Sequence, residues 1–265
     1  TFVVLSVVPA LGLAAYLWYA DVTTQEPLGL LIATFVLGVL LASFAGVLNP
    51  ILGGYASAIG SGFGLVPVFG TLAFFFFVVG PIEETVKILA VRLHAYRDDR
   101  FDAVIDGAVY GAVAGLGFAT IENALYITQT LGTAPEAANL IGEGSGIATV
   151  RALAGPGHVI YSAFAGYYLG LAKFNRDRAG PIVLKGLIIA TLIHGTYNTT
   201  VTILVPAVAS TTALSGFVAF FGFVIVYDGL FGLLLIRKLS KYNSAFRTVS
   251  QGDGPASRSE PPEFE

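Results

Sequence analysis

Two adjacent glutamates stand in a stretch that is otherwise apolar. In the segment GPIEETVK, Glu83 and Glu84 follow a run of phenylalanines and valines, and Lys87 comes four and three residues after them. On a helix this spacing places the lysine within reach of either carboxylate. One lysine cannot neutralise two acids, so we expect one of them to stay protonated or to bind a cation. Ionisable residues at membrane depth are functional by default, so this group predicts a chemical role.

A third acid occurs in the segment FATIEN, where Glu122 is followed by Asn123. No basic residue lies near Glu122 in the sequence, so it must find a partner on another helix or be protonated. Polar contacts between membrane helices are commonly made by asparagine but seldom by glutamate. We therefore expect Glu122 to belong to a functional site.

Two histidines complete the candidate set. His158 follows a Gly-Pro-Gly segment, and His194 precedes Asn198 by four residues, which places the latter two on one helical face. A lone buried histidine is usually a core residue, but two of them beside three glutamates indicate a site. Arg151 lies seven residues before His158, and it either holds part of a substrate or lies at the membrane interface.

The composition predicts that membrane helices position these residues. Of the 265 residues, 55% are hydrophobic and 12% are charged, whereas a soluble domain has about 25% charged residues. A net charge of −3 without a basic stripe argues against a nucleic-acid partner, and the absence of cysteine excludes disulfides and thiolate metal ligands. We expect an all-α polytopic bundle that contacts the lipid bilayer.

A spanning helix needs about 20 mostly apolar residues, and about seven stretches qualify. They are residues 2–20, 28–48, 69–90, 103–127, 148–173, 182–206 and 214–236. Residues 49–67 are interpreted as a loop or interfacial segment, with an eighth span as the alternative. Residues 1–241 then form the membrane-embedded domain, and residues 242–265 form a disordered polar tail.

The basic residues predict an orientation, because cytoplasmic loops collect lysine and arginine. They cluster in residues 92–102, in residues 173–178 and after position 236. All three clusters fall on one side if the N-terminus lies outside and the C-terminus lies in the cytoplasm.

In two antiparallel helices, residues at equal distances from the connecting turn lie at the same depth, and this predicts that the polar residues lie close together. The midpoint of His158 and His194 is position 176, inside a charged turn, so both histidines lie at one depth. Glu83 and Glu122 are level to within about 10 Å by the same reasoning. Pro81 and the proline before His158 predict interrupted helices around a buried polar site.

These residues in this order resemble the PrsW family of intramembrane proteases. The motifs that carry the resemblance are Glu83-Glu84-x-x-Lys87, Phe118-x-x-x-Glu122-Asn123, His158, His194-x-x-x-Asn198, Asp106-Gly-x-x-Tyr110-Gly and Val150-Arg151-Ala-Leu. The likeness extends nearly from the start of the chain to Ile236, and Asn198 departs from relatives that often carry Asp there. The resemblance implies a relation to CAAX-prenyl endopeptidases of the Ras-converting type and to bacteriocin-immunity-associated membrane proteases. It also implies cleavage of membrane-anchored proteins, an anti-sigma factor in some relatives, in the cell membrane of a prokaryote.

The expected reaction is peptide hydrolysis by activated water. Glu83 or Glu84 would take a proton from water and later protonate the leaving amine. The other catalytic candidates are Glu122, His158, His194 and Asn198, with Lys87, Asn123 and Arg151 in support. The residues leave open whether His158, His194 and Glu122 hold a zinc ion or whether no metal takes part. A ceramidase-like lipid amide hydrolase and a proton- or cation-coupled transporter are the alternative functions.

Overall fold

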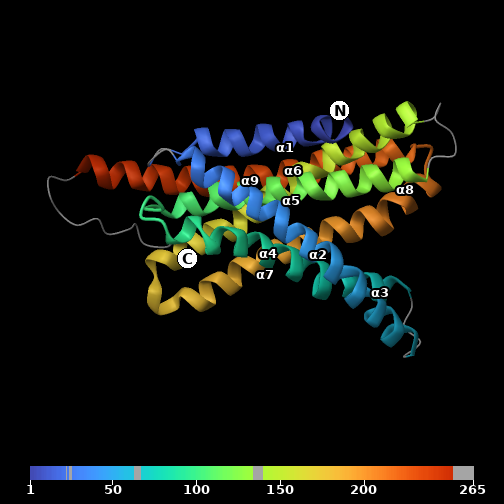
Figure 1. Ribbon diagram of the computed structural model, residues 1–265, viewed down its shortest axis with the longest axis horizontal. Helices are drawn as coiled ribbons and strands as arrows, with labels where there is room; N and C mark the ends of the chain where they lie inside the picture. The colour runs from blue at the N-terminus through green and yellow to red at the C-terminus, as the bar shows by residue number, and fades with distance from the viewer. Residues whose placement is uncertain (22, 24–25, 63–66, 134–139, 253–265) are drawn as a thin grey trace.

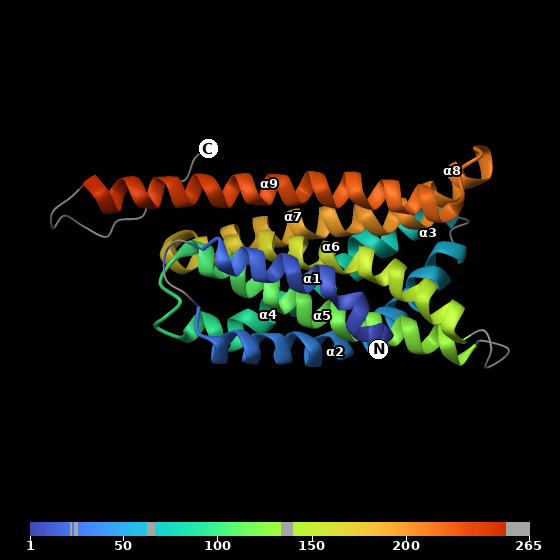
Figure 2. The same ribbon diagram turned by 90° about the horizontal axis from the view of Figure 1, so that it is seen from above.

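The computed structural model describes residues 1–21, 23, 26–62, 67–133 and 140–252, and within these ranges the protein is helical without strands. The helices are packed side by side along one direction (Figures 1 and 2). The long elements are α1 (Phe2–Tyr19), α2 (Leu28–Gly62), α5 (Val104–Gly132), α6 (Leu140–Phe174), α7 (Ala179–Thr199) and α9 (Gly216–Gly252). The shorter ones are α3 (Pro67–Phe74), η1 (Phe75–Val79), α4 (Gly80–Leu93), η2 (Ala95–Arg97), η4 (Arg176–Arg178), η5 (Thr200–Leu204) and α8 (Val205–Thr211). The prediction of an all-α bundle is confirmed.

Five helical stretches in the described residues are long and apolar enough to cross a membrane. They are Phe2–Tyr19, Leu28–Tyr55, Val104–Gly132, Arg176–Thr211 and Gly216–Thr248. The two other predicted spans are not among them. The stretch at 69–90 comprises parts of α3 and α4 with η1 between them, and the stretch at 148–173 belongs to α6, whose polar residues lower its hydropathy. These two stretches carry Glu83, Glu84 and His158.

The interpretation of residues 49–67 as a loop is wrong for most of its length, because α2 continues to Gly62. Its small residues allow close packing instead of breaking the helix. A Cβ atom built on Gly53 would lie 2.7 Å from the Phe74 ring of α3, which shows how closely α2 and α3 approach there. The extension also brings Asn49 into the bundle as a helical residue.

Helices α5 and α6 form the centre of the bundle and touch backbone to backbone. Gly107, Gly111 and Gly115 recur every four residues on α5, and Gly166 and Gly170 face them from α6. A Cβ atom on Gly166 would collide with the Gly107 carbonyl oxygen, and one on Gly115 would collide with the carbonyl oxygen of His158. Small residues at such crossings let membrane helices approach closely. The glycines therefore fix the helix that carries Glu122 against the helix that carries His158.

We predict that Gly166→Ala destabilises the protein by about 1–3 kcal/mol, because the added methyl group forces two backbones apart. The measurement is the free energy of unfolding in detergent micelles. Gly12→Ala on α1 is the matched control, since a Cβ there meets no atom within 4 Å. Equal stabilities of the two variants would contradict the packing described for α5 and α6.

The interruptions near the site take the form of π-helical turns. Turn η1 ends two residues before Pro81, and turn η5 ends two residues before Pro206. Proline lacks an N–H donor and displaces the carbonyl of the preceding turn, and a π turn absorbs this by widening the helix. The backbone stays helical through Val79 and Gly80, so α4 does not begin afresh at Pro81. The proline at position 156 lies inside α6 without such a turn.

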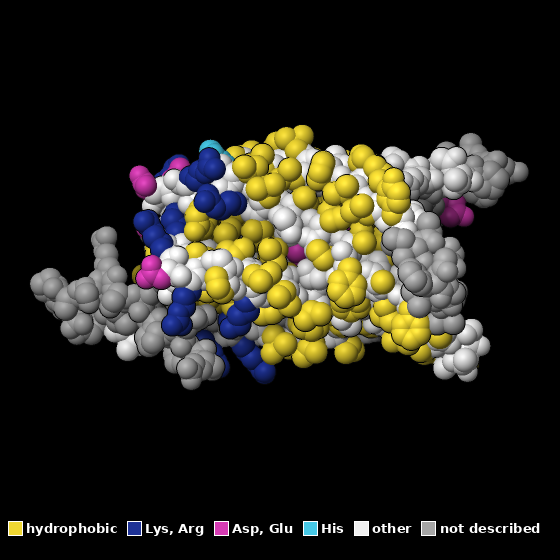
Figure 3. Space-filling view, turned by 90° about the horizontal axis from the view of Figure 1, so that it is seen from below, with side chains coloured by type: hydrophobic (Ala, Val, Ile, Leu, Met, Phe, Trp, Pro, Cys, Tyr) yellow, Lys and Arg dark blue, Asp and Glu magenta, His cyan; other side chains and the backbone are white. Residues whose placement is uncertain are grey.

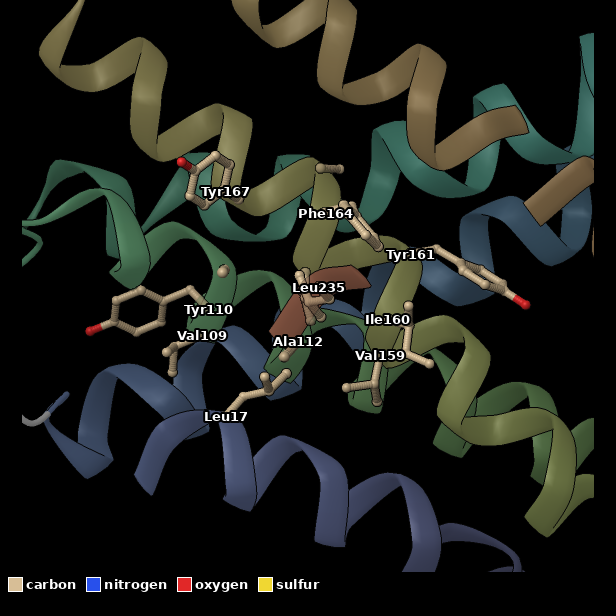
Figure 4. Packing of buried hydrophobic residues seen from close by; sticks show 14 of the residues in the cluster. Leu17, Val109, Tyr110, Ala112, Val159, Ile160, Tyr161, Phe164, Tyr167 and Leu235 are labelled. Carbon is tan, nitrogen blue, oxygen red and sulfur yellow. The ribbon is translucent and has the colours of Figure 1, made fainter. Parts of the chain in front are cut away.

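A hydrophobic core joins α1, α5, α6 and α9. In Figure 4, Leu17 of α1, Val109 of α5, Val159 of α6 and Leu235 of α9 converge in one cluster. Helix α9 extends to Gly252, so the first part of the predicted disordered tail, from residue 242 onward, is helical. It is anchored because the Tyr242 ring contacts Tyr167 of α6 and the Tyr242 hydroxyl accepts a hydrogen bond from the backbone N–H of Val104 on α5. The rest of the predicted tail, residues 253–265, lies outside the described residues.

The outer surface matches a protein embedded in lipid. Figure 3 shows hydrophobic side chains over the middle of the molecule and lysine and arginine side chains gathered at one end. Large apolar side chains such as Phe77 and Val226 are 81% and 71% exposed. In water such a surface would be costly, whereas in a bilayer it faces the hydrocarbon.

Candidate active site

A cavity of about 530 Å³ opens among α2, η1, α4, α5, α6, α7 and α9. Most of its wall is apolar, but several polar side chains contribute to it. The polar side chains in its lining include Asn49, Glu83, Glu122, Arg151, His158 and Asn198. A larger hollow of about 790 Å³ between η1, α4 and α7 has no ionisable residue in its lining. The chemistry of the molecule is therefore concentrated at the smaller cavity.

Glu84 lies behind the cavity wall, fully buried. Its Oε1 accepts a hydrogen bond from Lys87 Nζ at 2.7 Å and lies 2.8 Å from His194 Nδ1. A carboxylate paired in this way accepts from the imidazole, so Nδ1 carries the proton and Nε2 keeps its lone pair. Glu84 thus orients His194 and holds the lysine.

Glu83 reaches the cavity one residue earlier on α4. Its Oε1 accepts a hydrogen bond of 3.0 Å from Asn49 Nδ2, a residue of α2. Its Oε2 is buried without a hydrogen-bond partner among the described residues, 3.8 Å from Lys87 Nζ and 3.7 Å from His194 Nε2. The lysine is close to both acids, as the sequence spacing predicts, but it pairs closely with Glu84. Glu83 therefore presents an unshared carboxylate oxygen at the cavity.

Glu122 finds its partners on the neighbouring helix α6. Its Oε2 forms an ion pair with Arg151 and lies 2.8 Å from His158 Nε2. Arg151 also donates from Nε to Asn123 Oδ1 at 2.7 Å, and Asn123 Nδ2 bonds the hydroxyl of Ser6 on α1 at 3.1 Å. The expected partner on another helix is present. Arg151 is held inside the site, where it fixes Glu122.

The two histidines meet edge to face, with ring centroids 5.2 Å apart. Lys87 Nζ lies 2.9 Å from His158 Nδ1. Because an ammonium only donates, Nδ1 is the acceptor and the proton of this ring is on Nε2, where Glu122 accepts it. The Phe118 ring stacks on His158, and the Tyr161 ring stacks on His194. Acids and imidazoles from α4, α5, α6 and α7 thus converge as the spacing from the turns predicts.

The donor set fits a metal ion in part: Glu83 Oε2 and His194 Nε2 are available, but Lys87 and Glu122 occupy the two ring nitrogens of His158, so that ring could bind an ion only after one of these contacts is released. One ligand atom each from Glu83, His158 and His194 lies within 4.8 Å of the others. Two imidazoles and a carboxylate are sufficient protein ligands for a catalytic zinc. Two atoms suit metal binding. Glu83 Oε2 is buried and receives no hydrogen bond from the described residues, and His194 Nε2 is available because Glu84 holds the N–H at Nδ1 of the same ring. Glu122 contacts His158 and is not one of the three residues whose ligand atoms cluster.

Two residues near the site, Asn49 and Asp228, were not predicted from the sequence. Asn49 bonds Glu83 from a segment interpreted as a loop, and the two residues are 34 positions apart. Asp228 of α9 is buried and lies 3.4 Å from the Tyr161 hydroxyl, whose ring packs on His194. An acid in the last span is a signal that could have pointed to Asp228. Nothing local in the sequence marks Asn49.

Glu83, Glu122 and His158 line one cavity in a helical membrane bundle, and Glu84 and His194 lie directly against them. Residues 26–229 match the family model described as PrsW family intramembrane metalloprotease. The chain belongs to this family and is therefore an enzyme, an intramembrane protease. This membership decides against the lipid amide hydrolase and the transporter.

Curated relatives agree with the family match over most of the chain. Protease PrsW of Bacillus subtilis is 30% identical over 239 residues, which covers 89% of this chain and 94% of the relative. Protease PrsW of Oceanobacillus iheyensis is 33% identical over 193 residues, covering 72% of this chain and 79% of the relative. No solved structure matches the chain.

Proposed function

We propose that this protease hydrolyses peptide bonds of membrane-anchored proteins in the cavity, with Glu83 as the central residue. The observation that carries the proposal is the pair formed by Glu83 Oε2 and His194 Nε2. These two atoms lie 3.7 Å apart, and no hydrogen-bond partner of the described residues reaches the carboxylate oxygen. Two acceptors at this distance suit a shared water or cation between them.

The choice of Glu83 over Glu84 follows from their partners. Both the lysine and the imidazole of His194 already use Oε1 of Glu84, which lies behind the wall. Each of the two glutamates keeps its Oε2 without a hydrogen-bond partner among the described residues, but Glu83 lines the cavity and Glu84 does not. Glu83 is therefore the carboxylate that takes a proton from the attacking water and returns it to the leaving amine. Glu84 is a positioning residue.

The remaining candidates have supporting roles in this proposal. Asn198 lines the cavity one turn after His194, where its amide can donate to the oxyanion that forms during hydrolysis. Arg151 holds Glu122, and Glu122 in turn orients the N–H of His158. Asn123 ties this group to α1 through Ser6.

A zinc ion would be held by Glu83 and His194, whose ligand atoms lie close together, with His158 as the third ligand once one of its ring nitrogens is released from Lys87 or Glu122. When bound, such an ion lowers the pKa of its water to about 7 and polarises the scissile carbonyl. Glu122, which we expected as the third ligand, instead binds the ring of His158 from behind. Glu83 is required with or without the ion.

The substrate would be an integral membrane protein cut on its extracytoplasmic side. The basic residues gathered at one end of the bundle (Figure 3) support an orientation with that end in the cytoplasm. The N-terminus would then lie outside and the C-terminus inside, in the cell membrane of a prokaryote. Anti-sigma factors are one class of such substrates.

We expect protein purified without chelator to contain about one zinc per chain, because the site has three protein ligands. Removal of the zinc should lower cleavage of a co-expressed single-span protein, tagged at both ends, by at least about 100-fold. Elemental analysis and release of the tagged fragment are the measurements, and readdition of zinc should restore cleavage. Full cleavage by zinc-free protein would reject the metal and leave water activation to Glu83 alone.

A further inference from the structure

Three carboxylates converge at the end of the bundle opposite to α8, away from the active site. Asp21 and Glu26 belong to the turn between α1 and α2, and Asp106 lies in the first turn of α5. One ligand oxygen of each lies within 4.8 Å of the others. Asp106 precedes Glu122 by 16 positions on α5, which is about 24 Å of helix. The cluster is therefore separate from the cavity.

Each of the three carboxylates has at least one buried oxygen that receives no hydrogen bond in the described part of the chain. These are Asp21 Oδ2, Asp106 Oδ1 and both oxygens of Glu26, a residue only 2% exposed. The other oxygen of each aspartate accepts hydrogen bonds from residues close to it in the sequence. Asp106 Oδ2 accepts from the backbone N–H groups of residues 102 and 103 at 2.7 and 2.8 Å, and Asp21 Oδ1 accepts from Thr23. The unshared oxygens are the ones left for a ligand.

A fourth oxygen points into the same place. Tyr110 lies one turn after Asp106 on the same face of α5 and is 0% exposed, and its hydroxyl, which makes no close hydrogen bond among the described residues, lies near Glu26. In Figure 4 this hydroxyl points away from Tyr161, whose ring belongs to the active site. Its proximity to Glu26 favours the charged form of that carboxylate. Tyr110 is thus a second, independent buried oxygen at the cluster.

No lysine or arginine among the described residues forms an ion pair with these carboxylates. Burial, with a smaller contribution from the nearby charges of Asp21 and Asp102, raises the pKa of Glu26 to about 7 even though Tyr110 and Asp106 lower it. Burial also raises the pKa of Asp21. Buried acids in this situation need protons or a cation to balance them.

We propose that Asp21, Glu26 and Asp106 form a binding site for a hard divalent cation, Ca²⁺ or Mg²⁺. All available ligands are oxygens, which these ions prefer, and no imidazole or thiolate that would favour zinc belongs to the cluster. The cation would join the turn between α1 and α2 to the start of α5. It would thereby fix the end of the helix that carries Glu122.

The test is cation binding by full-length protein in detergent micelles after EDTA treatment and its removal. Thermal unfolding is followed against CaCl₂ and, separately, MgCl₂ at constant ionic strength, because a ligand of the folded state raises Tm in a saturable way. Terbium luminescence excited through tyrosine gives a second readout that does not depend on stability. The variants are Glu26→Gln and Asp21→Asn, with the exposed Asp177→Asn at the same end of the bundle as the matched control.

We expect saturable stabilisation by Ca²⁺ or Mg²⁺ that is weakened at least about tenfold in Glu26→Gln and in Asp21→Asn, because affinity depends on the number of charged ligands. Asp177→Asn should respond like the unmodified protein. Glu83→Gln should also respond, which separates this site from the catalytic one. The absence of saturable binding up to about 10 mM of either ion, beyond the range of weak protein sites, would overturn the proposal. So would an unchanged response in the Glu26→Gln/Asp21→Asn double variant.

Discussion

Glu83→Gln should abolish proteolysis while leaving the fold intact. Gln has the same shape, and its amide oxygen can still accept the hydrogen bond from Asn49. It cannot take a proton from water, and it is a poor ligand for a metal ion. Loss of a general base costs about 10²–10⁴-fold in rate, so we expect at least a 100-fold loss. The measurement is release of the tagged fragment from the co-expressed single-span protein, at equal enzyme levels.

Glu143→Gln is the matched control, because Glu143 is an exposed glutamate near the start of α6. It should cleave normally. Thermal unfolding of Glu83→Gln should stay close to that of the unmodified protein, which separates a chemical loss from a folding defect. Cleavage by Glu83→Gln at more than a tenth of the normal rate would remove Glu83 from its proposed role.

Lys87→Met should be the most destabilising single change in the site. Lys87 is 0% exposed and lies 2.7 Å from Glu84, 3.8 Å from Glu83 and 2.9 Å from His158 Nδ1. Its removal leaves a buried carboxylate without its cation, a change that costs about 3–5 kcal/mol. The measurement is the free energy of unfolding in mixed micelles by titration with denaturing detergent.

The double variant Lys87→Met/Glu84→Gln tests the cause of this loss. If the unpaired charge of Glu84 is responsible, its removal should restore most of the lost stability. Lys185→Met is the control, because Lys185 is exposed on α7. A double variant no more stable than Lys87→Met would mean that the packing of the lysine stem on the Phe118 ring dominates instead.

The sequence predicts much of this fold because lipid imposes a simple rule on length and hydropathy. The long apolar helices α1, α2, α5, α7 and α9 follow from it directly. The rule fails at residues 49–62, where a segment rich in glycine and serine resembles a loop in water but continues α2 as a helix, with Gly53 packed against Phe74. It also cannot predict the π turns, which depend on how the chain adapts to Pro81 and Pro206.

The convergence of the site was predictable because antiparallel helices place residues equidistant from a turn at one depth. His158 and His194 satisfy this condition, and their rings touch. The different surroundings of Glu83 and Glu84, on which their proposed roles depend, were not predictable, since neighbouring residues differ only by the direction in which the helix points them. Asn49 donates a hydrogen bond to Glu83, and this contact depends on the path of α2.

The glycine contact between α5 and α6 has a consequence for how the enzyme responds to its surroundings. Because the two backbones touch along Gly107, Gly111 and Gly166, they have no room to slide past each other. A bilayer that thins or thickens around the protein would tilt the pair as one rod. The separation of Glu122 and His158 would then stay constant while the peripheral helices adjust, so that hydrolysis could proceed in membranes of different thickness.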